Sequence, residues 1–455
     1  MRKKMISLAG VVCMLCVYIR PSSAAELTLG ELYAMADSQS VVIRIAEQAL
    51  LAANQELRQA KNALLPHLQA DISGSYIGDA YLLNRRFSAS GTTDVILAGL
   101  GPQQVQNGRQ TTPHWGNNFS FEASQMLYAG GALKANIEMA AISQRIAQLE
   151  VDKSRQEVRL MLSSYYLDLV RLQHQSAIIN THIDLTKQVL AMMRSRQEAG
   201  TVLTSDITRY ELQLKQLELA KIRLQDATQI IQYELQTNMH SPEELLPDTA
   251  WVSSEYNRLT AVLSESEWQS AALQTNLNLK QAKAQEDMAE QGVKRTRSAS
   301  IPKIALVIKD ELWGPYTSDL IPINANVNAW FVGIGIHYDI DQLWHNHRAI
   351  EKAKIARHIA QEKTTLAQET LANQVHACYA SFLTAFTEVA TQEKQQELAN
   401  ETYRLVSKRY ENDLALITDL LDASQSKLTA DLELADAHVR LLFSYYQLKY
   451  ITHTL

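Results

Sequence analysis

The sequence predicts a mostly α-helical protein with a membrane β-barrel portion, built from long α-helical hairpins and four β-strands per chain. Two runs without glycine or proline, Ala132–Ala199 and His347–Asn412, are each long enough for a helix of about 100 Å, which is wider than a single-domain core. Four segments alternate apolar and polar residues, as β-strands with one apolar face do. Strands and helices follow in the same order in both halves, which predicts an internal duplication.

The first pair of strands follows a helix that is predicted over Leu27–Leu65 and ended by Pro66. Residues 67–76 carry apolar side chains at every second position. The partner strand is predicted over Asn117–Leu127, after a loop over 78–116 that is rich in glycine, serine, threonine and asparagine. Each strand therefore has one apolar and one polar face.

The second pair begins after Pro302, with alternation over 304–308, a predicted loop over 311–327 and a strand over 330–338. Strands of roughly ten residues suffice to cross a bilayer when tilted. Aromatic residues gather at the strand ends, as they do at membrane interfaces. They are Tyr76, Trp115, Trp313 and Trp330 toward the loops, and Tyr128, Tyr338 and Trp344 toward the helices. Two soluble hairpins with a half-buried face are the alternative interpretation.

After the first long helix, Gly200 precedes a returning helix predicted over Asp206–Gln236. One apolar stripe begins at Ile207 and a second at Leu212, so this helix should have neighbours on both sides, as in the wall of a helical tube. The predicted division is a signal peptide over 1–25, a first repeat over 26–240, a linker over 241–265 and a second repeat over 266–455.

The N-terminus predicts export. Basic residues at 2–4, an apolar stretch and a small-residue cleavage site at Ser22–Ala25 are typical of a secretory signal peptide. Its removal takes four of the 43 basic residues, against 49 acidic ones, so the net charge becomes about −10, which argues against a nucleic-acid partner. Cys378 is then the last cysteine and cannot form an internal disulfide. The chain carries no sequence signature of an enzyme, a metal site or a cofactor site.

The strand count bears on assembly. Four strands cannot close a barrel, and an open edge in lipid leaves backbone groups unpaired at several kcal/mol each. Because the smallest single-chain barrels use about eight strands, at least two chains must combine theirs. Helices that continue on one side of such a barrel would form a hollow extension of it. The architecture therefore predicts a conduit.

Four segments also carry a family resemblance. They are Leu27-Thr28-Leu29, the elbow at Leu64-Leu65-Pro66, the elbow at 124–131 and the motif at 418–422. In their duplicated order they resemble the TolC-like outer-membrane efflux protein family over nearly the whole mature chain. The resemblance implies a homotrimer with a twelve-stranded barrel in outer-membrane lipid and a helical tunnel in the periplasm. It also implies a periplasmic adaptor and an inner-membrane pump as partners, and export of small molecules or proteins.

The elbows between strands and helices are a further expectation. They fall at Pro66, Gly130, Gly131, Pro302 and Asn346. Asn346 fits an elbow because asparagine tolerates the left-handed conformation that Gly130 adopts more easily.

At the inner end of the tunnel, the resemblance places Asp419 and Asp422 around the periplasmic aperture. Positions i and i+3 share a helix face, so three copies would crowd six carboxylates around one axis and attract cations. The alternative is that both residues cap or solvate a helix start. Asp206 matches the aspartate that closes the aperture of the family prototype, but Ala415 occupies the place of its arginine partner and Asp413 that of a glycine.

Closure must therefore use other contacts, for which Arg196, Arg409 and Tyr410 are the candidates. The residues expected in the tip turns and in contact with the adaptor are Arg196, Gly200, Leu203, Ser205, Arg409, Tyr410, Asp413, Leu416 and Thr418. The rival hypothesis is a periplasmic or secreted coiled-coil scaffold with soluble hairpins. It explains the helices but not the repeated strand pair with aromatic ends.

Overall fold

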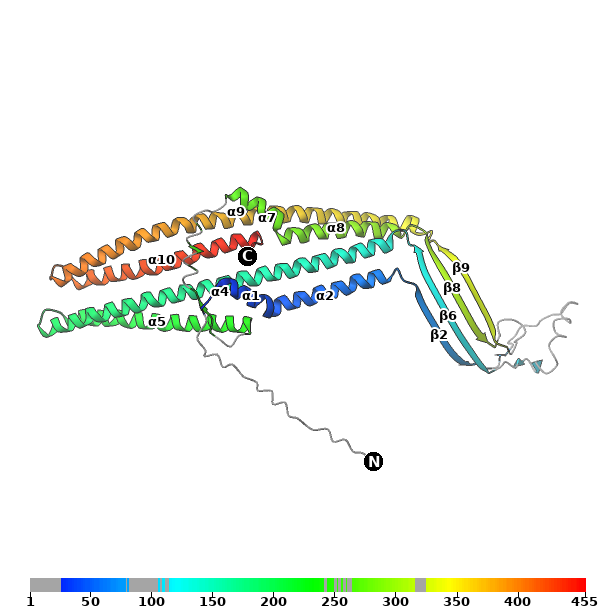
Figure 1. Cartoon of the computed structure of the whole chain (residues 1–455), viewed down its shortest axis with the longest axis horizontal. Helices are drawn as coiled ribbons and strands as arrows, with labels where there is room; N and C mark the ends of the chain where they lie inside the picture. The colour runs from blue at the N-terminus through cyan, green and yellow to red at the C-terminus, as the bar shows by residue number, and fades with distance from the viewer. Residues whose placement is uncertain are drawn as a thin grey trace, which may run out of the picture. The chain divides into compact units, whose positions relative to one another are not determined.

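The computed structural model describes residues 26–78, 80–81, 105–106, 109–110, 114–240, 244–248, 252, 255–256, 259, 264–315 and 325–455. The predicted signal peptide and most of the loop over 78–116 lie outside these residues. Long helices and four antiparallel strands dominate the chain, which confirms the predicted class (Figure 1). The helices are α1 (Leu29–Gln39), α2 (Val41–Asn62), α4 (Ala132–Glu198), α5 (Thr204–Met239), α7 (Glu265–Thr275), α8 (Leu277–Ser298), α9 (Gln342–Glu411) and α10 (Ile417–Ile451). The strands are β1 (Glu26–Leu27), β2 (His67–Tyr76), β3 (Ala80–Tyr81), β4 (Val105–Gln106), β5 (Arg109–Gln110), β6 (Trp115–Tyr128), β7 (Leu246–Pro247), β8 (Lys303–Gly314) and β9 (Val327–His337).

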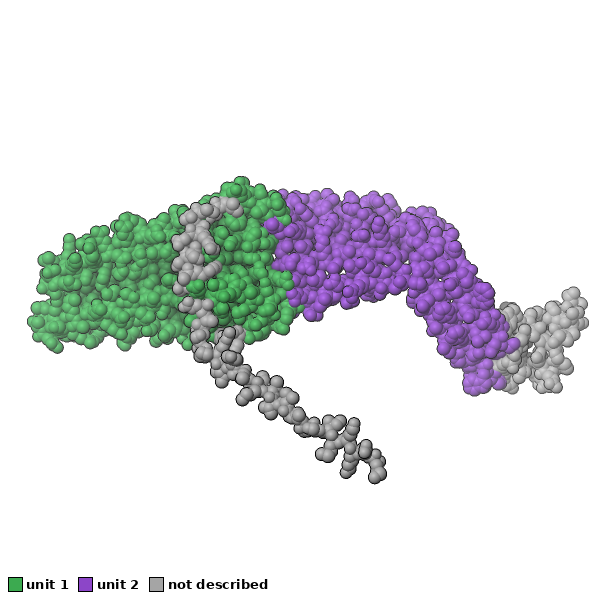
Figure 2. Space-filling model, in the orientation of Figure 1, with its two compact units in different colours: residues 1–44, 154–274, 372–455 green, residues 45–153, 275–371 purple. Residues whose placement is uncertain are grey.

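The chain forms two compact units, and each draws on both predicted repeats (Figure 2). Unit 1 comprises residues 1–44, 154–274 and 372–455, and it contains α5, α10 and the C-terminal parts of α4 and α9. Unit 2 comprises residues 45–153 and 275–371, and it contains the four-stranded sheet with α2, α8 and the N-terminal parts of α4 and α9. Among the described residues, no helix is both long and apolar enough to cross a membrane.

The sheet of unit 2 has the strand order β2-β6-β8-β9, and every neighbouring pair is antiparallel. Directly opposite residues share a face of an antiparallel sheet. The register pairs Ile72 with Phe119, Ala123 with Ile308, and Ile308 with Val332. The apolar positions of all four strands therefore lie on one face, as their alternation predicts. This face is uncovered within the single chain, where Ile72 is 81% exposed.

Three strands are longer than predicted. β6 runs over 14 residues, β8 over 12 and β9 over 11, so β8 reaches Gly314 and β9 begins at Val327, both within the predicted loop over 311–327. The polar residues in the second half of β8 weaken its alternation. They are nevertheless held in the strand because β6 and β9 pair with both sides of it. Pairing with two neighbours thus overrides a weak local pattern.

The helix predicted over Leu27–Leu65 is wrong in its first part. Leu27 belongs to β1, which pairs in parallel with β7, and the helix is interrupted at Ser40, whose backbone is extended. Thr28 and Glu31 form a capping box at the start of α1, with the Thr28 N–H donating to Glu31 Oε2 at 2.8 Å. The T-x-x-E spacing was the signal in the sequence for this later start.

The elbows of unit 2 follow one plan. Pro66 and Pro302 each stand directly before a strand, four residues after the end of α2 and of α8 respectively. Gly130 has a φ of +61°, and a Cβ placed there would lie 2.8 Å from Ile301 Cβ and 2.9 Å from the Ser298 carbonyl oxygen. Glycine is therefore required at position 130 both by backbone conformation and by space. Gly131 also has a positive φ, of +89°.

The prediction for Asn346 is wrong. The residue lies inside α9, which begins at Gln342, and it is not among the described residues with a left-handed backbone. Its side chain is buried and donates hydrogen bonds of 2.8 Å to the Thr296 carbonyl oxygen and to Ser300 Oγ. Asn346 thus ties α9 to the end of α8 through its amide, instead of shaping the turn through its backbone.

The helices of unit 1 pack as two hairpins, α4–α5 and α9–α10 (Figure 1). All four helices contribute to one apolar cluster near their turns, which we call the tip core. The buried side chains of the tip core are Val189, Leu190, Met193, Ile207, Tyr210, Tyr410 and Leu420. A second cluster farther along the helices joins α4, α5 and α10. The first predicted stripe of α5 is thus partly buried within the chain, whereas the second stripe, from Leu212 to Tyr233, is exposed.

Candidate functional site

The two hairpin turns of unit 1 have the same backbone geometry. At the first tip, Gly200 has a φ of +80° and the Thr201 N–H donates to the Arg196 carbonyl oxygen at 3.0 Å. At the second tip, Asp413 has a φ of +60° and the Leu414 N–H donates to the Arg409 carbonyl oxygen at 2.8 Å. A helix end closed by a left-handed residue and such a long backbone bond is a Schellman-type C-cap. The hairpins therefore end in equivalent turns.

Arg196 of the first tip holds the second tip. Its guanidinium donates to the carbonyl oxygens of Tyr410 at 3.1 Å and Glu411 at 2.7 Å, and to Asp413 Oδ1 at 3.0 Å. It also lies over the Tyr410 ring, 5.2 Å from the ring centroid. The Arg196 side chain is 24% exposed and that of Asp413 83% exposed, so the contacts to the buried side of the turn carry more of this interaction than the ion pair. We call this set of contacts the Arg196 tie.

Tyr410 sits between the tie and the tip core. Burial raises the pKa of Tyr410, while the neighbouring Arg196 charge opposes that rise. Burial likewise raises the pKa of Tyr210, which reaches the same core from α5. Both hydroxyls are therefore neutral over the physiological range, and the core receives one tyrosine from each hairpin.

The candidate aperture residues have different surroundings. Asp419 is exposed and accepts a hydrogen bond of 3.0 Å from the Leu416 N–H, so it caps the start of α10, as the alternative interpretation holds. Asp422 is exposed and lines an open groove between α9 and α10, with Gln425 and Glu433. Asp206 lies half-buried in the first turn of α5. A cap uses one carboxylate oxygen, so a role for Asp419 in an aperture stays a prediction.

The remaining tip residues are mostly exposed. Leu203 and Leu416 are the N-cap residues of α5 and α10 and make no side-chain cap hydrogen bond, because leucine offers no acceptor. Leu414 joins them as a third exposed leucine at the tips. Ser205 is exposed and Thr418 half-buried. Ala415 packs on the tip core, where its small apolar side chain fits.

The strand-end aromatics divide by face. Tyr76, Trp115, Tyr128 and Trp330 lie on the apolar face of the sheet, and the rings of Tyr76 and Trp115 meet edge to face at 5.6 Å. Trp313 is different, because it pairs with Asn118 and so lies on the polar face, which is the wrong side for a membrane girdle. Tyr338 follows the last residue of β9. Trp344 is exposed in the first turn of α9. A girdle role for the six aromatics other than Trp313 stays a prediction.

Sequence reasoning named Arg196, Tyr410 and Asp413 as tip residues but did not pair them. The tie consists largely of main-chain carbonyls of the second tip, and no residue type signals where a carbonyl will point. Burial raises the pKa of the Cys378 thiol, which makes it a weak nucleophile. Across the described parts of the chain, no group of three or more potential ligands is placed to hold a metal ion.

The whole chain has the fold of several solved channels. The outer membrane protein VceC from Vibrio cholerae is 15% identical with a TM-score of 0.72, over 93% of this chain and 96% of that one. The transmembrane channel CusC is 15% identical with a TM-score of 0.77, over 94% and 92%. The CmeC outer membrane channel of Campylobacter jejuni is 13% identical with a TM-score of 0.71, over 100% and 94%. Outer membrane channels are thus the class that the fold matches, in agreement with the predicted location.

The family comparison supports the same class. The family model of the outer membrane efflux protein matches residues 268–452, which is nearly all of the second predicted repeat. No curated protein sequence matches the chain. Residues 268–452 therefore form an outer membrane efflux protein domain, and the chain has the fold of the TolC-like channels that its sequence resembles.

Proposed function

We propose that three copies of this chain form an outer-membrane channel that carries small molecules or proteins out of the cell from an inner-membrane pump, through a periplasmic adaptor. One observation carries the proposal. The four-stranded sheet exposes a largely apolar face, interrupted by Asp310 and Gln125, and leaves β2 and β9 with one unpaired edge each among the described strands. A soluble protein rarely exposes such a face, and lipid does not tolerate such edges.

The strand directions allow the edges to close between copies. The strands alternate in direction from β2 to β9, so β9 of one copy runs antiparallel to β2 of the next. Three copies then supply twelve strands, with the apolar faces toward lipid. Barrels of this size enclose an open lumen. The polar face of the sheet, which carries Lys309, Glu311 and Glu122, would line that lumen.

The helices offer lateral surfaces for the same assembly. The second stripe of α5 and a stripe of α9 are apolar and exposed within one chain. They consist of Leu212, Leu219, Ile222, Ile230 and Tyr233 on α5, and of Leu383, Phe386, Leu398 and Leu405 on α9. Burial of such side chains stabilises by about 1.5–3 kcal/mol each. Neighbouring copies supply the apolar partner that the single chain lacks.

The tips would form the periplasmic end of the channel. We propose that the Arg196 tie takes over the task of the arginine that Ala415 replaces, holding the two hairpins of a protomer together when the aperture is closed. Asp419 and Asp422, with Asp206 beside them in the first tip, would surround the aperture in the trimer. The exposed Leu203, Leu414 and Leu416 give the adaptor an apolar contact at both tips.

Planar-bilayer recording tests the aperture. Asp419→Ala combined with Asp422→Ala should raise the single-channel conductance and remove block by divalent cations, because the charges that bind the blocking ion are gone. Glu397→Ala is a matched control, since Glu397 is an exposed acidic residue of α9. Unchanged conductance and block in the double variant would discard the aperture role while leaving the channel itself intact.

Fractionation tests the channel against the rival scaffold. Trimers that resist heating in detergent and sediment with outer membranes are expected of the channel. A monodisperse monomer in the soluble periplasmic fraction would overturn the proposal and favour the scaffold. Export of a dye or of a reporter protein by cells that express the chain with each of the two kinds of pump then distinguishes small-molecule from protein cargo.

A further inference from the structure

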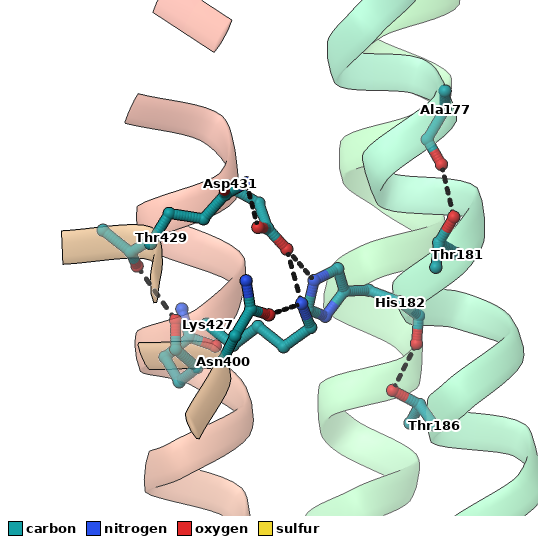
Figure 3. Close-up of polar contacts among 10 residues, drawn as sticks. Ala177, Thr181, His182, Thr186, Asn400, Lys427, Thr429 and Asp431 are labelled. Atoms are coloured by element: carbon teal, nitrogen blue, oxygen red, sulfur yellow. Dashed lines mark hydrogen bonds and ion pairs between the residues drawn. The ribbon is translucent and has the colours of Figure 1, made fainter. Parts of the chain in front are cut away.

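A charged group is buried at the junction of the two hairpins in unit 1. His182 of α4 lies 3.2 Å from Asp431 Oδ2 of α10, measured from its Nε2 atom. Lys427 of α10 also lies 3.2 Å from that same oxygen, measured from Nζ, and donates to Asn400 of α9. Gln396 of α9 donates to the other carboxylate oxygen at 2.8 Å. Figure 3 shows His182 and Lys427 meeting at the carboxylate of Asp431.

Besides His182, the contacts described above involve only two charged side chains, Asp431 and Lys427. From α10 come Asp431 and Lys427, whereas α9 contributes the uncharged amides of Gln396 and Asn400. At this level α5 packs apolar side chains against α4, Leu217 among them. Burial raises the pKa of Asp431, but hydrogen bonds from His182, Gln396 and Lys427 outweigh it and hold that pKa below its ordinary value. Asp431 therefore stays ionised in neutral and mildly acidic solution.

The charges balance only while His182 is neutral. One carboxylate then faces one ammonium, and the imidazole donates its Nε2–H to Asp431. When His182 takes up a proton from solvent on Nδ1, two cations share one oxygen atom, and their nitrogens are no more than twice 3.2 Å apart. An excess charge in a buried site is costly, so one cation must leave.

Lys427 is the group that can leave. Its side chain is 18% exposed and flexible, whereas that of His182 is 3% exposed and held among packed helices. We propose that His182, Asp431 and Lys427 form a proton-sensitive joint, in which protonation of His182 displaces Lys427 from Asp431 and releases the contact between Lys427 and Asn400 of α9. In acid, Asp431 then loses its ion pair with Lys427, which lies in the same hairpin. Its bond to the protonated His182, which lies in the other hairpin, becomes stronger.

Hydrogen–deuterium exchange tests the joint in the purified full chain. After correction for the intrinsic effect of pH, α9 amides around Asn400 should exchange about three- to tenfold faster at about pH 5.5 than at about pH 8, as expected for the loss of one hydrogen bond. The Asp431 carboxylate stabilises the fold above its lowered pKa, and this stabilisation is lost only at a pH below the two compared here. Titration of Asp431 therefore does not account for the change. His182→Gln, which keeps a donor but cannot titrate, should abolish the acceleration.

Two further variants make the outcome decisive. His376→Gln is the matched control, because His376 pairs with Glu265 at 2.9 Å on the surface and its loss should leave the acid response unchanged. Lys427→Met removes the competing cation, so its α9 amides should exchange fast at both pH values. Equal acid responses in wild type and His182→Gln, or none in wild type, overturn the joint. Conductance of the same samples separates this result from the proposed channel function, which does not depend on the joint.

Discussion

The two hairpin tips of unit 1 have the same backbone and different chemistry. Two residues before its end, each helix carries an arginine whose carbonyl accepts the closing bond, Arg196 in α4 and Arg409 in α9. Four residues after each arginine the backbone enters the left-handed region, at Gly200 in the first tip and at Asp413 in the second. The Arg196 side chain turns into the protein and binds the other tip, whereas Arg409 is exposed. The two tips thus share a backbone motif and differ in what their side chains bind.

The difference lies in what occupies the left-handed position. Glycine adopts this conformation without steric cost. A residue with a Cβ, such as aspartate, is destabilised there by roughly 1 kcal/mol. Asp413 recovers some of this through its bond to Arg196. A residue that is locally unfavourable therefore stands where it completes a contact between hairpins. Strain of this kind is expected where structure serves function.

The largest expected effect comes from removing the Arg196 tie. Arg196→Ala should destabilise the tips by about 1–3 kcal/mol, because a charged donor is lost and the carbonyls at 410 and 411 lose a partner. Arg409→Ala is the matched control and should change stability by less than about 0.5 kcal/mol, as exposed side chains do. Hydrogen exchange of peptides covering 404–420 measures both. Equal effects of the two substitutions would show that the tips have not diverged in function.

A smaller effect is expected from the backbone of the first tip. Gly200→Ala should cost about 1 kcal/mol, since alanine pays the left-handed penalty that glycine avoids. No atom lies within 4 Å of a Cβ placed there, so the effect isolates backbone conformation from packing. Exchange of peptides covering 194–206 gives the magnitude. A neutral substitution would mean that the first tip is free to change its turn.

Much of the fold could be predicted because it rests on local patterns. The glycine-free and proline-free runs predicted α4 and α9 to within a few residues, and strict alternation predicted the shared apolar face of the sheet. The break at Ser40 was missed because the apolar periodicity runs through it, although Asp37, Ser38 and Ser40 are residue types that favour caps over helix interiors. Asn346 failed for a different reason, since its burial against Thr296 and Ser300 joins residues about 50 positions apart.

The site was less predictable than the fold. Asp206, Asp419 and Asp422 came from the family resemblance, and an aperture formed by them would need the proposed trimer. Arg196 was a candidate only by position, since its partners are main-chain carbonyls 214 and 215 residues away. The His182 joint gave no signal at all, because its members are spread over three helices. Both candidate sites consist of contacts between segments distant in sequence, whereas periodicity reports only on neighbouring residues.

The ion pair at the second tip can be separated from the backbone. Asp413→Asn keeps a residue that tolerates the left-handed region but removes the charge facing Arg196. Because Asp413 is highly exposed, stability should fall by only about 0.2–1 kcal/mol. The loss should also shrink as salt is raised, since salt screens the wild-type pair. A loss as large as that of Arg196→Ala, measured by exchange of the same peptides, would make the ion pair the main element of the tie.

The smallest effect at neutral pH is expected in the tip core. The buried Tyr210 hydroxyl has no hydrogen-bond partner among the described residues, so Tyr210→Phe should change stability by about 1 kcal/mol or less, toward greater stability. Burial raises the pKa of Tyr210 in the folded protein, so this tyrosine favours folding below its ordinary pKa of about 10 and disfavours it progressively as the pH rises beyond that value. Tyr210→Phe should therefore lose less stability between about pH 9 and pH 11 than wild type. Tyr233→Phe, at an exposed tyrosine of the same helix, should follow the wild-type profile in urea unfolding. If both variants followed it, ionisation of Tyr210 would not limit the stability of the tip core in alkaline solution.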